Sequence, residues 1–131
     1  MTLDTFTFCD FAQESNGKMT VVGTFNVLRL NKVPSVYQNL YIAIRVSFAP
    51  EEEGNHVLKV TFKHKESGTE LLPPLELTTQ SVQNDGMYSS MNLPFSVPFL
   101  NFEREGTYCC NVIVDKSINQ TIELYVKTQQ S

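Results

Sequence analysis

The sequence predicts one all-β domain, an antiparallel β-sandwich of about eight strands that takes up residues 1–131. Three observations support this prediction. Apolar residues alternate with polar ones along several segments, which is the period of a strand with one buried face. Turn signals rich in Gly, Pro, Asn and Asp separate these segments about every eight to fifteen residues. No segment has the period of an amphipathic helix.

The first predicted element is a hairpin over residues 6–27. Its turn is Asn16-Gly17, a pair in which both residues tolerate positive φ, so a two-residue turn fits. With this turn Phe8 lies opposite Phe25, and the apolar residues of the two strands share one face.

The clearest strand covers residues 40–48, in which every second residue is a large apolar one. The segment Pro50 to Gly54 interrupts this pattern, and a second alternating segment follows at residues 58–65. We interpret the two segments as a second hairpin, in which Val46 pairs with Leu58.

The C-terminal half contains four more predicted strands. A short strand at residues 75–77 follows Pro73-Pro74, which lack N–H donors and therefore suit a strand start or a sheet edge. In residues 91–99 the apolar residues alternate with two prolines, which predicts an edge strand with Phe99 facing inward. The remaining predicted elements are a loop at residues 83–86 and strands at residues 108–114 and 122–126.

The start of the strand at residue 108 has the pattern of a tyrosine corner. Gly106 comes two residues before Tyr108, as in Greek-key sandwiches where the tyrosine hydroxyl bonds to the backbone a few residues upstream. We therefore expect the Tyr108 hydroxyl to bond to a backbone group within residues 102–105.

Several short motifs together carry a family resemblance. They are Cys9-Asp10-Phe11-Ala12, Gly17-Lys18, Gly23-Thr24-Phe25, the segment Phe48 to His56, Glu105-Gly106-Thr107-Tyr108 and Val112-Ile113-Val114-Asp115. With these motifs the chain resembles a bacterial family of uncharacterised small proteins with immunoglobulin-like sandwiches. The resemblance covers most of the chain and implies an immunoglobulin-like fold. It implies no catalytic residue, because the motifs are turn and core positions.

Composition and charge exclude several classes of protein. Fourteen acidic and ten basic residues give a net charge of −4, which argues against nucleic-acid binding. The N-terminal residues lack the pattern of a secretory signal, and no apolar run approaches the ~20 residues that span a bilayer. The three cysteines, Cys9, Cys109 and Cys110, form an odd set that we expect to be reduced. We therefore expect a cytoplasmic protein that does not bind membranes.

Asp10 is the residue most at odds with its predicted position. The hairpin register places it on the apolar face, opposite Gly23, where an unpaired carboxylate is costly. Asp10 is therefore a candidate buried polar site, as an acid, a base or a cation ligand in a pocket. In the alternative, backbone amides or the Tyr108 hydroxyl bond to it, or a bulge near Gly23 turns it outward.

No motif predicts a catalytic, cofactor or metal site. His56 and His64 are separated by about 26 Å of extended chain, so they do not bind one metal together. Neither a nucleophile elbow nor a phosphate-binding glycine motif occurs. We expect no catalytic residue, no metal and no cofactor.

The outer face of the second predicted hairpin is the candidate partner surface. Directly opposed like charges are unfavourable, and the predicted pairing places Arg45 opposite Lys59. The neutralising group is either an acid on a neighbouring strand, Glu76 or Glu123, or an acidic partner protein. The candidate partner-binding residues are Arg45, Lys59, Lys63 and Tyr41.

Together these patterns predict a non-enzymatic protein-interaction or binding module with an unidentified protein partner. The alternative is a small enzyme or ligand-binding protein with a pocket around Asp10. Convergent polar groups around Asp10 would favour the alternative, whereas a flat charged sheet face would favour the module.

Overall fold

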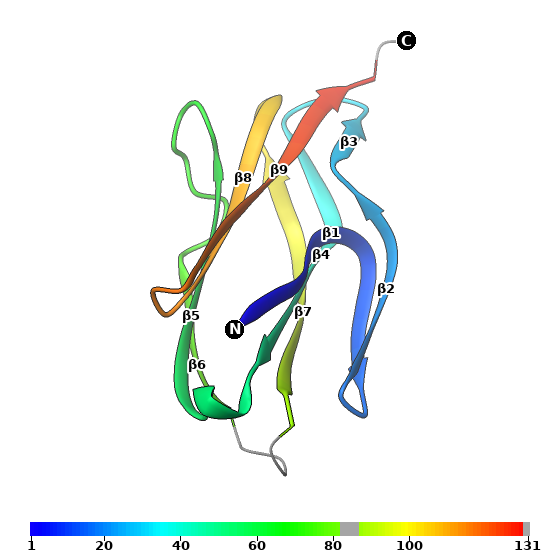
Figure 1. Cartoon of the computed structure of the whole chain (residues 1–131). Coiled ribbons are helices and arrows are strands. Elements are labelled where there is room, and N and C mark those ends of the chain that lie inside the picture. Colours follow the sequence, from blue (N-terminus) through cyan, green and yellow to red (C-terminus); the bar gives the residue numbers. More distant parts are fainter. Residues whose placement is uncertain (82–86, 130–131) are drawn as a thin grey trace.

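The chain folds into two β-sheets packed face to face, as seen in a computed structural model that describes residues 1–81 and 87–129 (Figure 1). The described residues form nine strands, against the eight or so predicted. The predicted loop at residues 83–86 lies outside the described residues. The strands are β1 (Thr2–Ser15), β2 (Lys18–Phe25), β3 (Val27–Leu30), β4 (Ser35–Phe48), β5 (Gly54–His64), β6 (Leu75–Ser81), β7 (Ser89–Phe102), β8 (Gly106–Val114) and β9 (Ile118–Thr128).

The strands form a four-stranded sheet in the order β2-β1-β4-β7 and a five-stranded sheet in the order β3-β9-β8-β5-β6. The all-β prediction is confirmed, and each sheet is open, with two edge strands. The predicted antiparallel pairing holds for every pair of described strands except β3 with β9, which run parallel. No helix in the described part of the chain is long and apolar enough to cross a membrane.

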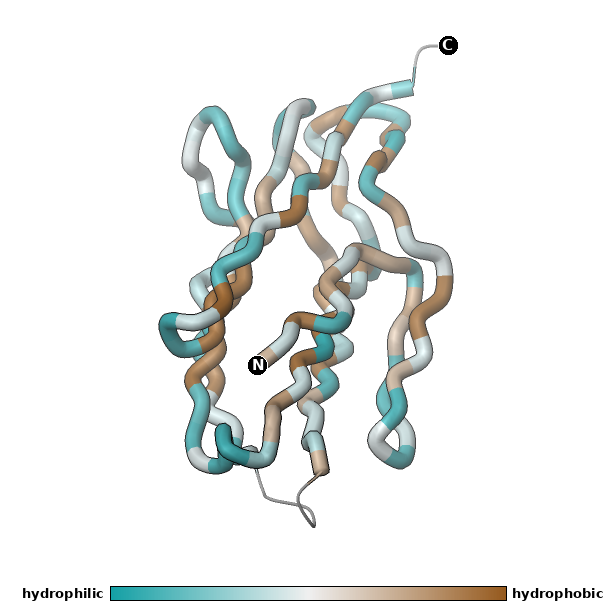
Figure 2. Tube along the Cα trace, in the orientation of Figure 1, coloured by the Kyte–Doolittle hydropathy of each residue, from teal (hydrophilic) through white to brown (hydrophobic). Residues whose placement is uncertain are grey.

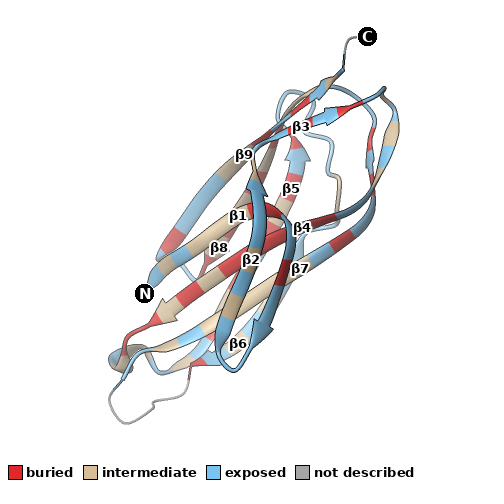
Figure 3. Cartoon of the chain, turned by 90° about the vertical axis from the view of Figure 1, so that its right-hand side faces the viewer, coloured by how far each residue is buried: buried red, intermediate tan, exposed pale blue. Residues whose placement is uncertain are grey.

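The core lies between the two sheets, where the apolar faces of the strands meet. Figure 2 shows hydrophobic residues along the strands of both sheets. β4 shows the predicted alternation, because Leu40, Ile42 and Ile44 are at most 1% exposed, whereas Tyr41 and Arg45 lie half-buried on the outer face. The buried positions of β4 are coloured red in Figure 3. The largest fully buried side chains are Phe8, Phe48, Phe62 and Phe102.

The first predicted hairpin is confirmed in its turn and its register. Asn16 and Gly17 have φ values of 53° and 76°, and Phe8 pairs with Phe25. The second strand of the hairpin ends at Phe25, however, and Val27 begins β3 in the other sheet.

The β1–β2 hairpin folds back over the outer face of the four-stranded sheet. A second, small core lies beneath it, formed by Cys9, Ala12 and Ala43, with Met19 and Val21 packed against it. At the hairpin tip the carbonyl of Gly17 accepts hydrogen bonds from Arg45 and Asn92, at 3.2 Å and 3.1 Å. One face of β1 thus contributes Phe8 to the main core and Ala12 to the small one.

The predicted second hairpin is wrong. β4 pairs with β1 and β7, whereas β5 pairs with β6 and β8, so the two strands belong to different sheets. A 3-10 turn, η1 (Pro50–Glu52), carries the chain across. Val46 therefore pairs with Leu3 and Met91, and Leu58 pairs with Leu77 and Val114.

β7 is an edge strand, as predicted, but its alternation changes at Phe99. Val97 and Leu100 are both buried, and Phe99 between them has a φ of 52° and is 74% exposed. The predicted inward position of Phe99 is therefore wrong. A single residue in the left-handed region turns the strand over, and the regular period does not continue through it.

The predicted tyrosine corner is confirmed. The hydroxyl of Tyr108 donates a hydrogen bond of 2.6 Å to the carbonyl of Arg104, and the side chain is 2% exposed. The ring packs edge-on against Phe102, which ties the start of β8 to the end of β7.

Replacing Tyr108 by Phe leaves the ring in place and removes the hydroxyl that donates a hydrogen bond to the Arg104 carbonyl. We expect Tyr108→Phe to lower the free energy of unfolding by about 1 kcal/mol, measured by urea denaturation. The matched control is Tyr125→Phe, which removes an exposed hydrogen bond from the Tyr125 hydroxyl to Glu123 and should change stability by less than half as much. Equal midpoints for Tyr108→Phe and the wild type would contradict this role.

Candidate functional site

A predominantly apolar opening lies on the side where the edge strands of the two sheets meet. β6 ends the five-stranded sheet and β7 ends the four-stranded sheet. The two edges are joined near Ser81 and Ser89, whose hydroxyls lie 2.8 Å apart. Toward the other end they diverge and leave an opening that we call the open-side groove.

Two adjoining pockets make up the open-side groove. The edge pocket, about 370 Å³, is predominantly apolar, and its walls include Leu72, Leu75 and Phe95. The rim pocket, about 300 Å³, lies next to it and shares Leu72 and Pro98 in its wall. The polar side chains of the rim pocket include Glu70, Asn101, Glu103 and Arg104.

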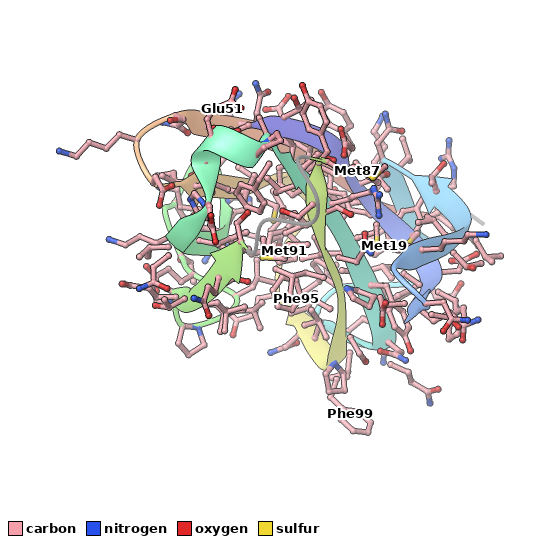
Figure 4. The ribbon with its side chains drawn as sticks, turned by 60° about the horizontal axis from the view of Figure 1, so that its bottom comes forward. Met19, Glu51, Met87, Met91, Phe95 and Phe99 are labelled. Atoms are coloured by element: carbon pink, nitrogen blue, oxygen red, sulfur yellow. The ribbon has the colours of Figure 1, made fainter. Side chains whose placement is uncertain are left out.

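An apolar row runs along β7 beside the groove. Figure 4 shows Met91, Phe95 and Phe99 along this strand, with Phe99 pointing away from the rest of the chain. Met91 and Phe95 pack partly against the main core. Phe99 is the most exposed large apolar side chain among the described residues, and it also lines the rim pocket.

The four residues predicted to bind a partner do not share a surface. Arg45 and Tyr41 lie in β4 of the four-stranded sheet, whereas Lys59 and Lys63 lie in β5 of the five-stranded sheet. The predicted arrangement fails because it rested on pairing between β4 and β5. The ring of Tyr41 packs edge-on against Phe11, under the folded hairpin.

Arg45 makes contacts within the chain. Its guanidinium donates to Asn92 Oδ1 at 2.6 Å and to the Gly17 carbonyl at 3.2 Å, and its Nε lies 3.6 Å from Asp4 Oδ2. Arg45 thus joins β4, β7, the N-terminal end of β1 and the hairpin tip.

The outer face of the five-stranded sheet carries exposed ion pairs. Lys59 lies 3.9 Å from Glu76, and Lys65 lies 3.0 Å from Glu123. Glu76 is therefore the neighbouring-strand acid for Lys59. Exposed pairs of this kind contribute little to stability, typically about 0.2–1 kcal/mol.

Asp10 lies opposite Gly23, as the register predicts, but it is exposed rather than buried. Gly23 has a φ of 68°, and a Cβ placed there would lie 2.4 Å from Asp10 Oδ2. The pairing of β1 with β2 runs past Gly23 without a register shift, so the exposure of Asp10 does not come from a bulge. A shallow pocket of about 250 Å³ remains, with Thr24 and Tyr37 in its wall. Burial raises the pKa of Tyr37, and the charge of Asp10 raises it further.

His56 stabilises the connection between β4 and β5, which carries the chain from one sheet to the other. Its Nδ1 lies 2.7 Å from Asp115 Oδ2 and its Nε2 lies 2.7 Å from the Glu52 carbonyl, while its ring stacks on Phe48. Asp115 also accepts a hydrogen bond from the backbone N–H of Val57. Partial burial acts to raise the pKa of Asp115, but these hydrogen bonds outweigh it, so the pKa lies below its ordinary value.

His64 has an equally local set of contacts. Its Nδ1 lies 2.9 Å from the Ser67 hydroxyl, and its Nε2 lies 3.2 Å from the Glu105 carbonyl. Within residues 1–81 and 87–129, no three His, Cys, Asp or Glu side chains converge to hold a metal ion.

All three cysteines are free thiols. Cys110 faces the core, and burial raises its pKa to about 12, so it remains protonated and unreactive at neutral pH. Cys109 lies on the outer face, as expected for adjacent strand residues, and its pKa is raised by burial and by Glu123. Cys9 is buried under the hairpin.

Sequence reasoning did not find the open-side groove. Two features of the sequence could have indicated it. One is the prolines at its borders, Pro73-Pro74 before β6 and Pro94 and Pro98 in β7, and the other is the distribution of charge. Residues 66–103, which include β6 and β7, contain no Lys or Arg.

The Asp115 contacts make stability depend on pH. A carboxyl whose pKa is lower in the folded state stabilises the fold above its unfolded value, near 3.8, and this contribution fades as the pH falls through the folded pKa. We expect Asp115→Asn to lower the free energy of unfolding at pH 7, and the difference from wild type to shrink below pH 3.8. Urea denaturation across this range measures it, with the exposed Glu51→Gln as control. A difference that stays constant down to the acid limit would contradict the assignment.

We expect Arg45→Ala and Lys63→Ala to have different effects on the free energy of unfolding. Arg45→Ala removes the hydrogen bonds to the hairpin tip and to β7, so we expect it to lower the free energy of unfolding by about 1–2 kcal/mol. Lys63→Ala removes an exposed side chain and should change stability by less than about 0.5 kcal/mol. Urea denaturation of both variants tests this contrast, and similar losses would show that Arg45 has no special role in holding the hairpin.

Comparison with solved structures gives only distant similarity. The chain is similar to part of a β-glucosidase from Listeria innocua in complex with isofagomine, with 11% identity and a TM-score of 0.48. The same enzyme in complex with glucose gives 11% identity and a TM-score of 0.47. Each match covers 78% of this chain and 15% of the enzyme. At this level of similarity the enzyme's activity gives no information about this chain.

Comparison with curated protein sequences gives no match. The sequence profile of a family described as a family of unknown function (DUF6941) matches residues 4–127, almost the whole chain. This chain therefore belongs to DUF6941.

Proposed function

We propose that the chain is a non-enzymatic protein-interaction module, which binds an extended apolar segment of a partner protein in the open-side groove. The observation that carries this proposal is Phe99, which is 74% exposed and has a φ of 52°. For a residue with a side chain the left-handed conformation costs about 1–2 kcal/mol, and an exposed Phe ring gains nothing from burial. Strained residues with exposed aromatic rings are typical of binding sites.

The shape of the groove supports an extended ligand. The edge pocket and the rim pocket adjoin at Leu72 and Pro98, so they form one elongated depression rather than a compact cavity. The walls of the edge pocket are mainly aliphatic and aromatic side chains, which favour apolar side chains of a ligand. Phe99 lines the rim pocket and offers an exposed ring for a bound segment to contact.

The alternative proposal, an enzyme or ligand-binding protein at Asp10, has weaker support. Asp10 is exposed, and its pocket is shallower and smaller than either part of the open-side groove. The other polar side chains that line this pocket are those of Thr24 and Tyr37. General acid or base catalysis requires groups that converge on one reacting atom, and this arrangement offers less convergence than a catalytic pocket needs.

We also propose a cytoplasmic location and an immunoglobulin-like classification within a bacterial family. Three free thiols, two of them buried, suit a reducing compartment. The tyrosine corner at Tyr108 and the two-sheet architecture support the classification.

Phe99→Asn tests whether Phe99 is retained for binding rather than for stability. Asn tolerates the left-handed region better than Phe, so we expect the free energy of unfolding to stay constant or to rise by up to about 1 kcal/mol. Peptides selected from a random display library on the wild-type protein should bind Phe99→Asn at least about tenfold more weakly, a loss of roughly 1.4 kcal/mol.

The matched control is Val22→Ser, which removes another exposed apolar side chain from the folded hairpin. Selected peptides should bind this variant as they bind the wild type, when measured by fluorescence anisotropy. Equal binding to wild type and Phe99→Asn would refute the groove, and selective loss with Val22→Ser would place the binding surface on the hairpin instead.

A further inference from the structure

The charge of the chain is distributed unevenly along its sequence, and the acidic segment includes the border strands of the open-side groove. Residues 66–103 contain five of the fourteen acidic residues and none of the ten basic residues. Both border strands, β6 and β7, lie within this segment. The rest of the chain has nine acidic and ten basic residues, so the net negative charge belongs to this segment.

The described acidic side chains lie along one border of the groove and at its rim. Glu70 and Glu103 line the rim pocket, and Glu76 is an exposed residue of β6 that already pairs with Lys59 at 3.9 Å. Arg104, the residue that follows the segment, is the one Lys or Arg among the described residues that line either pocket, and His64 also lines the rim pocket. A ligand with positive charge and apolar side chains therefore complements this surface.

The two border strands differ in their capacity to accept a further strand. β7 contains Pro94 and Pro98, which have no N–H to donate to a neighbour, so its free edge is protected against strand addition. β6 contains no proline between Leu75 and Ser81 and pairs only with β5 among the described strands. Its other edge is therefore free to pair with an extended segment.

The side chains of β6 determine the pattern of such a segment. Leu77 and Thr79 are half-buried on the inner side of the strand, whereas Glu76, Thr78 and Gln80 are exposed on the outer side. In an added strand, the residues next to Leu75 and Leu77 would point into the edge pocket. The alternate residues would lie on the outer face beside Glu76.

We infer that the partner segment is a β-strand of alternating apolar and basic residues, which pairs with the free edge of β6 and places its apolar side chains in the edge pocket. This inference rests on the proposed function and specifies the chemistry of the ligand. A second copy of this chain fits the site less well, because its own border strands β6 and β7 contain no basic residue.

The test uses synthetic peptides of about nine residues with blocked ends, long enough to span the seven residues of β6. One peptide alternates valine with lysine, and a second alternates valine with glutamate. Two further versions of the lysine peptide carry N-methyl groups on alternate residues, so that one or the other edge of the extended peptide cannot donate hydrogen bonds. Fluorescence anisotropy measures binding to the full chain at low and at physiological salt.

We expect the lysine peptide to bind at least about tenfold more tightly than the glutamate peptide, and this preference to decrease with salt. The two methylated peptides should differ by at least about tenfold, because only one peptide edge faces β6. Glu70→Gln combined with Glu76→Gln should weaken binding of the lysine peptide severalfold. The control Glu51→Gln, an exposed acid of η1, should leave it unchanged.

Three outcomes would overturn the inference. Equal binding of the two methylated peptides would exclude strand addition, and equal binding of the lysine and glutamate peptides would exclude the charge preference. Dimerisation of the chain that is abolished by Thr78→Pro would assign the β6 edge to a second copy. If Phe99→Asn weakens binding while the methylated peptides stay equal, the groove of the proposed function survives and only strand addition fails.

Discussion

The connection between β4 and β5 carries the chain from one sheet to the other, and the surfaces of the molecule depend on this crossing. His56 holds it in place from three sides, through Asp115 in the β8–β9 turn, the Glu52 carbonyl in η1 and the ring of Phe48. If β4 and β5 had formed a hairpin, Arg45 and Lys59 would share one face. Because the chain crosses instead, Arg45 becomes available to hold the β1–β2 hairpin, and β6 and β7 become the edges of an open side.

Much of the local structure could be predicted from the sequence, because it depends on neighbouring residues. The Asn16-Gly17 turn sets the register of the first hairpin, and Gly106 and Tyr108 mark the corner. The alternation in β4 likewise identifies its buried face. Alternation does not, however, tell which strand lies beside β4, because a hairpin and a sheet crossing require the same pattern of buried residues. The interruption from Pro50 to Gly54 is compatible with both.

The candidate site was harder to predict, because it consists of the borders of two sheets that are distant in the sequence. Phe99 belongs by its spacing to the inward set of β7, and only the left-handed backbone at this residue brings it to the surface. Asp10 shows the same limit, since its register is correct but its side chain is exposed rather than buried. The lack of Lys and Arg in residues 66–103 was visible in the sequence. It points to a binding surface only once β6 and β7 are known to border one groove.

The parallel pair of β3 and β9 has a consequence for biosynthesis. It joins residues 27–30 to residues 125–128, so an early segment of the chain obtains its partner only from the last strand. On the ribosome the four-stranded sheet has all its strands once residue 102 has emerged, whereas the five-stranded sheet still lacks β8 and β9. The apolar face of the first sheet stays in contact with water during this interval, when nascent chains are most prone to aggregate. The order of translation thus sets how long the half-built sandwich needs protection by a chaperone.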